Sequence, residues 1–292
     1  MSPKGGETMR QILTLDHNFK MLFGSMENIE LLTSFLSCIL EIPYNELEGN
    51  ITFAKQELKE EIHVVRQTVD VLVNLPSKII HIEMNPVYYH WSKRRNFIYG
   101  ARIYENQFTS GDDYKKEINY IQINLNGYKQ TKTKKVQEVY KMMSSDGKEW
   151  IKDFEIREIN IPNCKKMWYD GDRREEVLWP SIFGCDSKVE FSKIIGESIM
   201  EEKTKEKLEK VVDNITKDQQ VWWDYEKDEQ MIINSLKSDA KEEGHAEGLA
   251  EGRAEGRMDE RMELARKMKD EALSLEMISR ITSLSTEEIE KL

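Results

Sequence analysis

Two short apolar runs with acidic residues inside them decide the fold: Val69-Asp70-Val71-Leu72-Val73 and Ile79-Ile80-His81-Ile82-Glu83-Met84-Asn85. Both runs are rich in β-branched residues, and a proline-bearing stretch, 74–78, separates them, so we predict a β-hairpin. A carboxylate inside an apolar strand is costly unless something compensates its charge. Asp70 and Glu83 therefore need a compensating partner, and a divalent metal ion is one such partner.

Strand geometry places the candidate residues of this hairpin relative to one another. Side chains alternate along a strand, so His81, Glu83 and Asn85 share one face. If 75–78 form a four-residue turn, Asp70 lies opposite Glu83 on that face, whereas a slip of one residue sends the two acids to opposite faces. The aligned register thus brings two carboxylates and an amide to one small region.

The chemistry of that region leaves two interpretations open. Two hard oxygen acids with open positions suit Mg²⁺ or Mn²⁺, which prefer a few carboxylates together with water and phosphate. Alternatively, Asp70 and Glu83 are solvent-facing residues on a half-exposed hairpin, because an acid, a turn and a second acid occur by chance in many proteins.

Further motifs follow one another along the chain. The hairpin pattern, D-x(12)-E-x-N, resembles the metal-site core of the PD-(D/E)XK nuclease superfamily. Residues 16–24 resemble the "D-x-x-F-K-x-L-F-G" opening of the recombination-promoting nuclease/putative transposase family, the Rpn family. The chain also resembles that family in its "R-x-x-Y-Y" helix at 94–99, in its turn and strand at 111–114 and 121–124, and in its C-terminal Glu-Gly repeats.

The resemblance implies an α/β fold, a restriction-endonuclease-like PD-(D/E)XK core with a helical C-terminal extension. It also implies a metal-dependent DNA endonuclease linked to recombination or mobile elements. In that reading Asp70 and Glu83 bind Mg²⁺ or Mn²⁺, which activates a water and neutralises the scissile phosphate. Asn85 would orient that water.

Five more residues are candidates around this site. Asp16 and Glu57 are the candidates for a third acid. Lys20, Arg94 and Arg95 are the candidates for contacts with DNA phosphates, or for bracing the site.

One position departs from the family pattern. The family usually carries Gln two residues after the Glu, and the wider superfamily carries Lys, whereas this chain has Asn85 followed by Pro86. The Asn side chain reaches about 1.5 Å less far, one C–C bond. A second class of function therefore stays open: a catalytically inactive PD-(D/E)XK-fold module that binds DNA or a partner protein. Metal-dependent nicking of plasmid DNA distinguishes the two.

The distribution of charge bears on DNA binding. The formal net charge is −11, but most of the excess acid lies after residue 200. Ten basic residues stand against four acids in 93–135, next to the proposed metal hairpin: Lys93, Arg94, Arg95, Arg102, Lys115, Lys116, Lys129, Lys132, Lys134 and Lys135. We expect phosphate contacts there, with an ordinary solvated helix face and charged loop as the alternative.

The chain divides into four expected parts: a disordered N-terminus, 1–10; a nuclease-like core, 11–165; a helical extension, 166–240; and a Gly/Glu-repeat helix with a terminal helical hairpin, 241–292. Within the core we expect a helix capped by Asp16, helices at 29–40 and 91–108, and strands at 51–58, 118–125 and 150–161. The helix at 91–108 would bury an apolar stripe of Phe97, Ile98, Ala101, Ile103, Tyr104 and Phe108. Trp222 and Trp223 are expected to pack against the core rather than stack on bases.

Glycines recur every four residues in the tail, at 244, 248, 252 and 256. Each weakens a helix by about 1 kcal/mol relative to Ala, so we expect partner packing to stabilise this segment and a homo-oligomer to form through 241–292. An extended, partly frayed helical linker is the alternative. Ser285 and Glu288 have the spacing of a capping box at the start of the last helix.

Several classes of protein are disfavoured. No apolar run approaches the length of a membrane helix, and the first residues lack the apolar region of a signal peptide. Three widely spaced cysteines indicate free thiols in a reducing cytoplasm, and five histidines without metal-site spacing argue against a zinc enzyme.

Overall fold

The computed structural model describes residues 12–54, 69–108, 111, 119–128, 135–217, 256–271 and 273–292. The chain forms two compact units, Met1–Ile232 and Ile233–Leu292. Each unit is described by itself.

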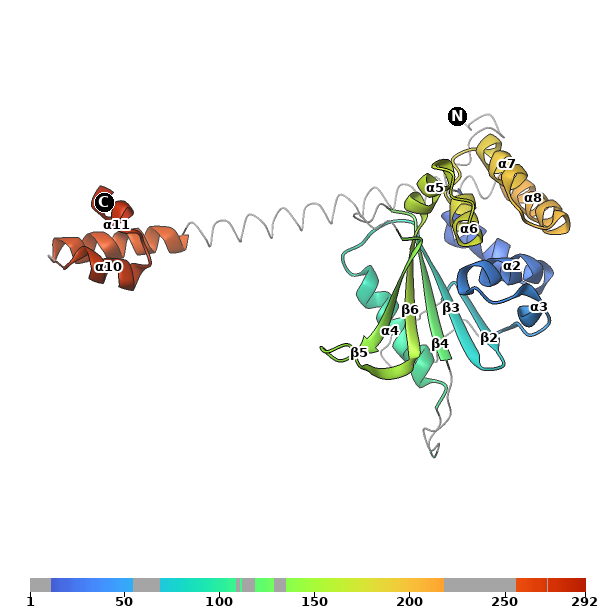
Figure 1. Cartoon of the computed structure of the whole chain (residues 1–292), viewed down its shortest axis with the longest axis horizontal. Coiled ribbons are helices and arrows are strands. Elements are labelled where there is room, and N and C mark those ends of the chain that lie inside the picture. The colour runs from blue at the N-terminus through green and yellow to red at the C-terminus, as the bar shows by residue number, and fades with distance from the viewer. Residues whose placement is uncertain are drawn as a thin grey trace. The chain divides into compact units, whose positions relative to one another are not determined.

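A six-stranded mixed sheet is the centre of the first unit (Figure 1). Its strands are β1 (Thr52–Phe53), β2 (Val71–Leu75), β3 (Lys78–Asn85), β4 (Asn119–Asn126), β5 (Gln137–Met143) and β6 (Glu149–Asn160). They lie in the order β1-β2-β3-β4-β6-β5, with β3, β4 and β6 parallel and the other pairs antiparallel. The expected α/β fold, consistent with a PD-(D/E)XK nuclease, is confirmed.

The β2–β3 hairpin has the register that the sequence predicts. Asn74 pairs with Ile79 and Leu75 with Lys78, so the turn has four residues. Val71 pairs with Ile82, and the next position outward in this register places Asp70 opposite Glu83. Both acids therefore belong to the same face of the sheet.

Ten helical segments accompany the sheet in the described part of this unit. They are η1 (Ile12–Thr14), α1 (Asp16–Phe23), η2 (Met26–Asn28), α2 (Ile29–Leu40), α3 (Tyr44–Leu47), α4 (Ser92–Glu105), α5 (Ile161–Tyr169), α6 (Glu175–Phe183), α7 (Lys188–Glu197) and α8 (Glu202–Lys217). The helix at 29–40 is confirmed to the residue, and α4 falls within the expected 91–108.

The apolar face of the sheet packs against α1, α2 and α6. Ile80, Ile82 and Met84 of β3 enter one large core that also holds the helical side chains. Within it the rings of Phe23 and Trp179 lie 5.4 Å apart and those of Phe23 and Phe183 5.8 Å apart.

This core crosses the expected boundary at residue 165. Trp179 and Phe183 are fully buried in α6, and the same core continues through Leu208 and Ile215 of α8. Residues 166–217 thus complete the core rather than extend from it, because the aromatic residues of α1 and α2 find their partners on α6.

Helix α4 covers the opposite face and turns a polar side toward it. Asn96, Gly100 and Ile103 are buried, whereas Phe97 and Ile98 of the expected apolar stripe are 46 % and 40 % exposed. The expectation was wrong for Phe97 and Ile98, whereas Ile103 is buried in a second apolar cluster on this face and Tyr104 packs against it. Gly100 permits the close approach: a Cβ there would lie 2.4 Å from Gln122 Oε1.

Two other local expectations need correction. Asp16 is the first residue of α1, and Leu15 occupies the capping position, so Asp16 does not cap this helix. Strand β5 was not expected; it pairs with β6 at the edge of the sheet and is half to fully exposed, so it lacks the buried apolar run that marks an inner strand. The expected strand at 51–58 is described only as β1, since 55–58 lie outside the described residues.

The described part of the second unit is a helix at 256–270 followed by α10 (Leu275–Thr282) and α11 (Thr286–Lys291). Ala265, Ile278, Leu284 and Ile289 form its small core. The predicted capping box of Ser285 and Glu288 is present at the start of α11. Trp222, Trp223 and the glycines at 244, 248 and 252 lie outside the described residues.

Two further properties concern the whole described chain. No helix in it is long and apolar enough to cross a membrane. The three cysteines are free, and burial raises the pKa of the Cys38 and Cys164 thiols to about 12.

Candidate nuclease site

Polar side chains line one face of the sheet toward the carboxyl ends of β3, β4 and β6. Eight of them are nearly or fully buried: His81, Glu83, Asn85, Gln122, Asn124, Asn126, Glu158 and Asn160. The alternation of each strand places them on the face that α4 covers. Buried polar groups are stable only when they are hydrogen-bonded, and here they bond mainly to one another.

Asp70 and Glu83 form the acidic part of this face. They are 9 % and 4 % exposed, so the alternative of solvent-facing acids on a half-exposed hairpin is wrong. The Met84 N–H donates to Asp70 Oδ2 at 2.8 Å, which ties Asp70 to β3. Burial, and then the repulsion of the Glu83 carboxylate, raises the pKa of Asp70 well above its ordinary value.

Asp16 and Lys20 on α1 complete the surroundings of Asp70. The Lys20 Nζ lies 2.6 Å from Asp16 Oδ1 and 3.5 Å from Asp70 Oδ1. Burial opposes ionisation of Asp16, but hydrogen bonds with Asp70 and Lys20 outweigh it and lower the Asp16 pKa. Burial likewise opposes the Lys20 charge, yet the hydrogen bond to Asp16 and the attraction of Asp70 raise the Lys20 pKa. The structure thus places the candidate third acid in contact with Asp70.

Glu83 is held from two sides. The His81 Nε2 lies 2.6 Å from Glu83 Oε1, and its other ring nitrogen, Nδ1, lies 2.8 Å from the Tyr120 hydroxyl. The Arg95 Nη2 lies 4.0 Å from Glu83 Oε2. His81 and Tyr120 fix the carboxylate, while one oxygen faces the guanidinium.

Both ends of the Asn85 side-chain amide make contacts within the protein. Its Oδ1 accepts from Arg95 Nη2 at 2.8 Å and from Asn96 Nδ2 at 3.3 Å. Its Nδ2 donates to Asn126 Oδ1 at 3.2 Å. The amide therefore braces Arg95 and β4.

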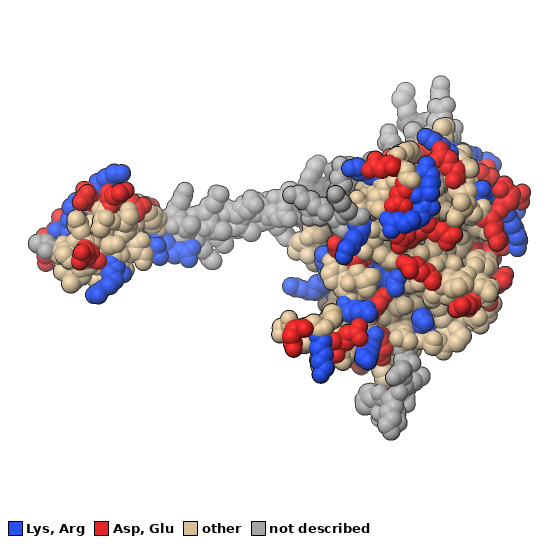
Figure 2. All heavy atoms as spheres, viewed as in Figure 1, with Lys and Arg blue, Asp and Glu red and all other residues tan. Residues whose placement is uncertain are grey.

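The remaining candidates are spread over the surface or lie outside the described residues. Arg94 and Lys93 are exposed on α4. Glu57 is not among the described residues, and neither are Lys115, Lys116, Lys129, Lys132 and Lys134. Figure 2 shows Lys and Arg interspersed with Asp and Glu over one face of the described chain.

Sequence reasoning missed Asn96, Gln122, Asn124 and Glu158. A signal for two of them was available: Gln122 and Asn124 alternate with the apolar residues that identify strand β4. Polar residues on the second face of a strand ordinarily indicate a solvated face. Only the position of α4 shows that this face is buried.

The donor set bears on metal binding. Among the described residues, no group of three or more His, Cys, Asp and Glu side chains is arranged to hold a metal ion. Asp70 and Glu83 instead offer two carboxylates whose mutual repulsion a cation would relieve. Such a pair fits Mg²⁺, which binds through one or two carboxylates and keeps several waters.

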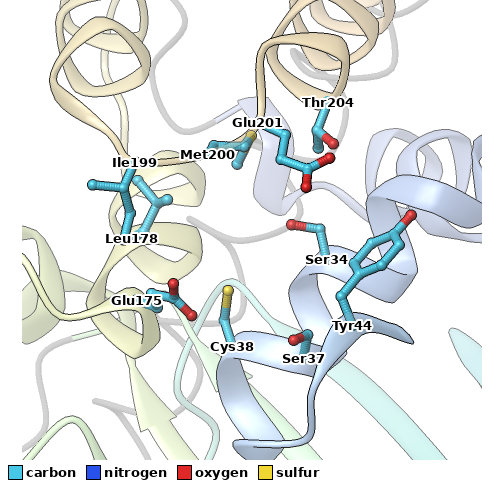
Figure 3. A pocket seen from close by; sticks show the side chains of 10 residues that line it. All are labelled: Ser34, Ser37, Cys38, Tyr44, Glu175, Leu178, Ile199, Met200, Glu201 and Thr204. Carbon is cyan, nitrogen blue, oxygen red and sulfur yellow. The ribbon is translucent and has the colours of Figure 1, made fainter. Parts of the chain in front are cut away.

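A separate cavity of about 160 Å³ lies among α2, α6 and α8 (Figure 3). Ser34, Cys38, Tyr44, Glu175 and Glu201 are among its lining residues. None of the residues of the polar face lines it.

The sheet carries two buried acids on its antiparallel hairpin beside parallel strands, an arrangement consistent with the PD-(D/E)XK nuclease fold. The family model of the PD-(D/E)XK nuclease family transposases matches residues 13–240. The chain belongs to this family, as its hairpin and opening motif predict. Nucleases of the PD-(D/E)XK type generally use divalent metals and act on DNA. No curated protein and no solved structure matches the chain.

Proposed function

We propose that this protein is a metal-dependent DNA endonuclease. The observation that supports the proposal most directly is the burial of Asp70 and Glu83 on one face of the hairpin, with the pKa of Asp70 raised by burial and by Glu83. A protein that keeps two repelling buried acids loses stability, and such costs are concentrated at functional sites. The link to recombination or mobile elements rests on the family.

Asp70 and Glu83 would hold Mg²⁺ or Mn²⁺, which supplies an activated water and neutralises charge on the phosphate. His81 fixes Glu83 in its orientation, and Asp16 shares a hydrogen bond with Asp70. Lys20 supplies a cation beside Asp70, so it can provide the positive charge that the neutral Asn85 lacks. Arg95, half-buried beside Glu83, and the exposed Arg94 would contact phosphate oxygens.

A second function is favoured by one specific observation. Both ends of the Asn85 amide bond to protein groups, and its oxygen accepts from two donors, which favours a bracing role over the orientation of a water. A member of the family without catalysis would keep this brace and use the fold to bind DNA or a partner protein. The free cysteines fit a protein of the reducing cytoplasm in either case.

Nicking of supercoiled plasmid separates the two functions. Wild-type protein should convert plasmid to the open circle with Mg²⁺ or Mn²⁺ and not with a chelator, while Asp70→Ala and Glu83→Ala should lose that activity and stay folded. Asp146→Asn, in the exposed β5–β6 turn, is the matched control and should cleave as wild type does. Nicking by both site variants at the wild-type rate would reject the metal site. DNA binding without cleavage by the wild type would support the second function.

A further inference from the structure

We propose that Glu158 is a positioning residue that sets the orientation of the Asn85 amide through Asn126, and so holds Arg95 next to Glu83. The proposal deepens the proposed nuclease function and rests on it. It assigns a role to an acid on β6, two strands away from the β2–β3 hairpin.

A continuous line of hydrogen bonds, here called the relay, joins Glu158 to Arg95. The Asn126 Nδ2 donates to Glu158 Oε2 at 2.6 Å, and Asn85 Nδ2 donates to Asn126 Oδ1 at 3.2 Å. The Arg95 Nη2 then donates to Asn85 Oδ1 at 2.8 Å. Glu158, Asn126 and Asn85 are 8 %, 1 % and 3 % exposed, so bulk water does not replace a contact that is lost.

The two ends of this line have opposite hydrogen-bonding character. A guanidinium only donates, and an ionised carboxylate only accepts, whereas each amide between them presents one donating and one accepting end. Arg95 therefore requires the oxygen of Asn85 on its side, and Glu158 requires the NH2 of Asn126 on its side. The two requirements agree, and they leave one arrangement in which every contact pairs a donor with an acceptor.

Side contacts strengthen the same arrangement. The second oxygen of Glu158 accepts from Asn124 Nδ2 at 2.7 Å, so both of its oxygens are occupied by amide donors. The Tyr128 hydroxyl donates to Asn126 Oδ1 at 3.1 Å. Asn126 is thus fixed with its oxygen toward Asn85 by two independent partners.

The consequence for the site concerns Arg95. The Asn85 oxygen holds the Arg95 Nη2 at a place 4.0 Å from Glu83 Oε2. If the Asn85 amide turned over, its NH2 would face the guanidinium and the Asn96 NH2, and Arg95 would leave. The line from Glu158 thereby fixes a cation beside a metal-binding acid.

Glu158→Gln tests this polarity with almost no change of shape. The new side chain has one donating end, which meets the NH2 of either Asn124 or Asn126. If Asn126 turns to accept it, the Asn126 NH2 then faces that of Asn85, and the mismatch passes on to Arg95. Asn126→Asp alone creates a different mismatch, because the new carboxylate faces that of Glu158 and neither group can donate.

The double variant Glu158→Gln with Asn126→Asp restores every pair. The new glutamine accepts from Asn124 and donates to the new aspartate, whose other oxygen accepts from Asn85 and from the Tyr128 hydroxyl. Net charge is the same as in the wild type. A double-mutant cycle on these two positions therefore isolates the relay from a general loss of packing.

The experiment measures Mg²⁺-dependent nicking at saturating plasmid, the KM for plasmid, and the ¹H–¹⁵N signals of the Asn85 amide and the Arg95 guanidinium without DNA. Each single variant should lower the saturated rate by about tenfold or more while KM changes little, because Glu158→Gln leaves a buried donor facing a donor and Asn126→Asp leaves a buried acceptor facing an acceptor. Both should also shift the Asn85 and Arg95 signals. The double variant should return the rate and the signals close to the wild type.

The outcomes separate failure of the relay from failure of the function. Unchanged Asn85 and Arg95 signals in Glu158→Gln would overturn the relay, as would a double variant no better than the worse single variant. If wild-type protein does not nick DNA, the nuclease proposal fails, and the NMR signals alone decide whether Glu158 orients Asn85.

Discussion

The Lys20 Nζ on α1 lies 3.5 Å from Asp70 Oδ1 at the start of the β2–β3 hairpin. The same amino group lies 2.6 Å from Asp16 Oδ1, so one cation serves two of the acids around the site. A helix that precedes the hairpin in sequence thus contributes a charge to it. This relationship makes Lys20 the first residue to test after the acids themselves.

We expect Lys20→Met to lower metal-dependent nicking by roughly 10²-fold, because preorganised charge next to the reacting groups is a large contribution to catalysis. Lys20→Arg should retain part of the activity. Lys210→Met, on the exposed side of α8, is the control for loss of one positive charge and should change the rate little. Equal rates for Lys20→Met and Lys210→Met would remove Lys20 from the site.

The raised pKa of Asp70 predicts a dependence of stability on pH. The folded protein binds the Asp70 proton more tightly than the unfolded chain, so this group's contribution to stability is present at low pH and is lost as pH rises through the raised pKa. A tenfold difference in proton affinity between the folded and unfolded states corresponds to about 1.4 kcal/mol. Asp70→Asn should flatten this part of the Tm-against-pH curve.

Divalent cations should raise the stability of the folded protein, whereas a rise in pH through the Asp70 pKa should lower it. A cation at Asp70 and Glu83 competes with the proton, so the rise in Tm on adding Mg²⁺ should grow as pH rises and should vanish in Asp70→Asn. Thermal unfolding at several pH values, with Mg²⁺ and with a chelator, measures both effects. A Mg²⁺-induced increase in Tm that Asp70→Asn retains would place the cation elsewhere.

Gly100→Ala should destabilise the first unit. The new Cβ would lie 2.4 Å from Gln122 Oε1 and 2.8 Å from the Tyr120 hydroxyl, so α4 or the polar network must move, at a cost of roughly 1–3 kcal/mol. Gly196→Ala in α7 is the matched control, since its Cβ meets nothing within 4 Å, and it should be neutral or slightly stabilising. Denaturant unfolding of both variants measures the difference, and equal midpoints would show that α4 is not tightly packed there.

Two truncations test the extent of the core. Deleting 241–292 should leave a folded first unit of smaller assembly size, whereas deleting 166–292 should unfold the chain because Trp179 and Phe183 leave the aromatic core. Loss of one buried aromatic side chain alone typically costs about 3–5 kcal/mol. Circular dichroism reports folding, and light scattering reports assembly. A folded 1–165 fragment would restore the expected boundary, and an unchanged assembly size would leave the tail as a linker.

Local pattern was enough to predict the hairpin and its register, since period-two alternation and a four-residue turn leave one pairing in which both acids share a face. It was also enough for the helix at 29–40, whose apolar spacing is helical throughout. Alternation could not predict β5, because an exposed edge strand need not carry an apolar face. Helical spacing predicted the burial of Ile103 in α4 but failed for Phe97 and Ile98, because the buried side of this helix also follows the polar side chains beneath it.

The sequence by itself determined the family, the α/β order and the positions of Asp70 and Glu83, because these depend on neighbours in the chain and on a turn of known length. Tertiary structure decided the rest of the site. Lys20 and Arg95 reach the hairpin from α1 and α4, Glu158 on β6 connects to it through Asn126, and no spacing along the chain encodes these contacts. Burial of the polar face is likewise a property of packing: hydrogen bonds among side chains from separate elements replace the water that each would otherwise keep.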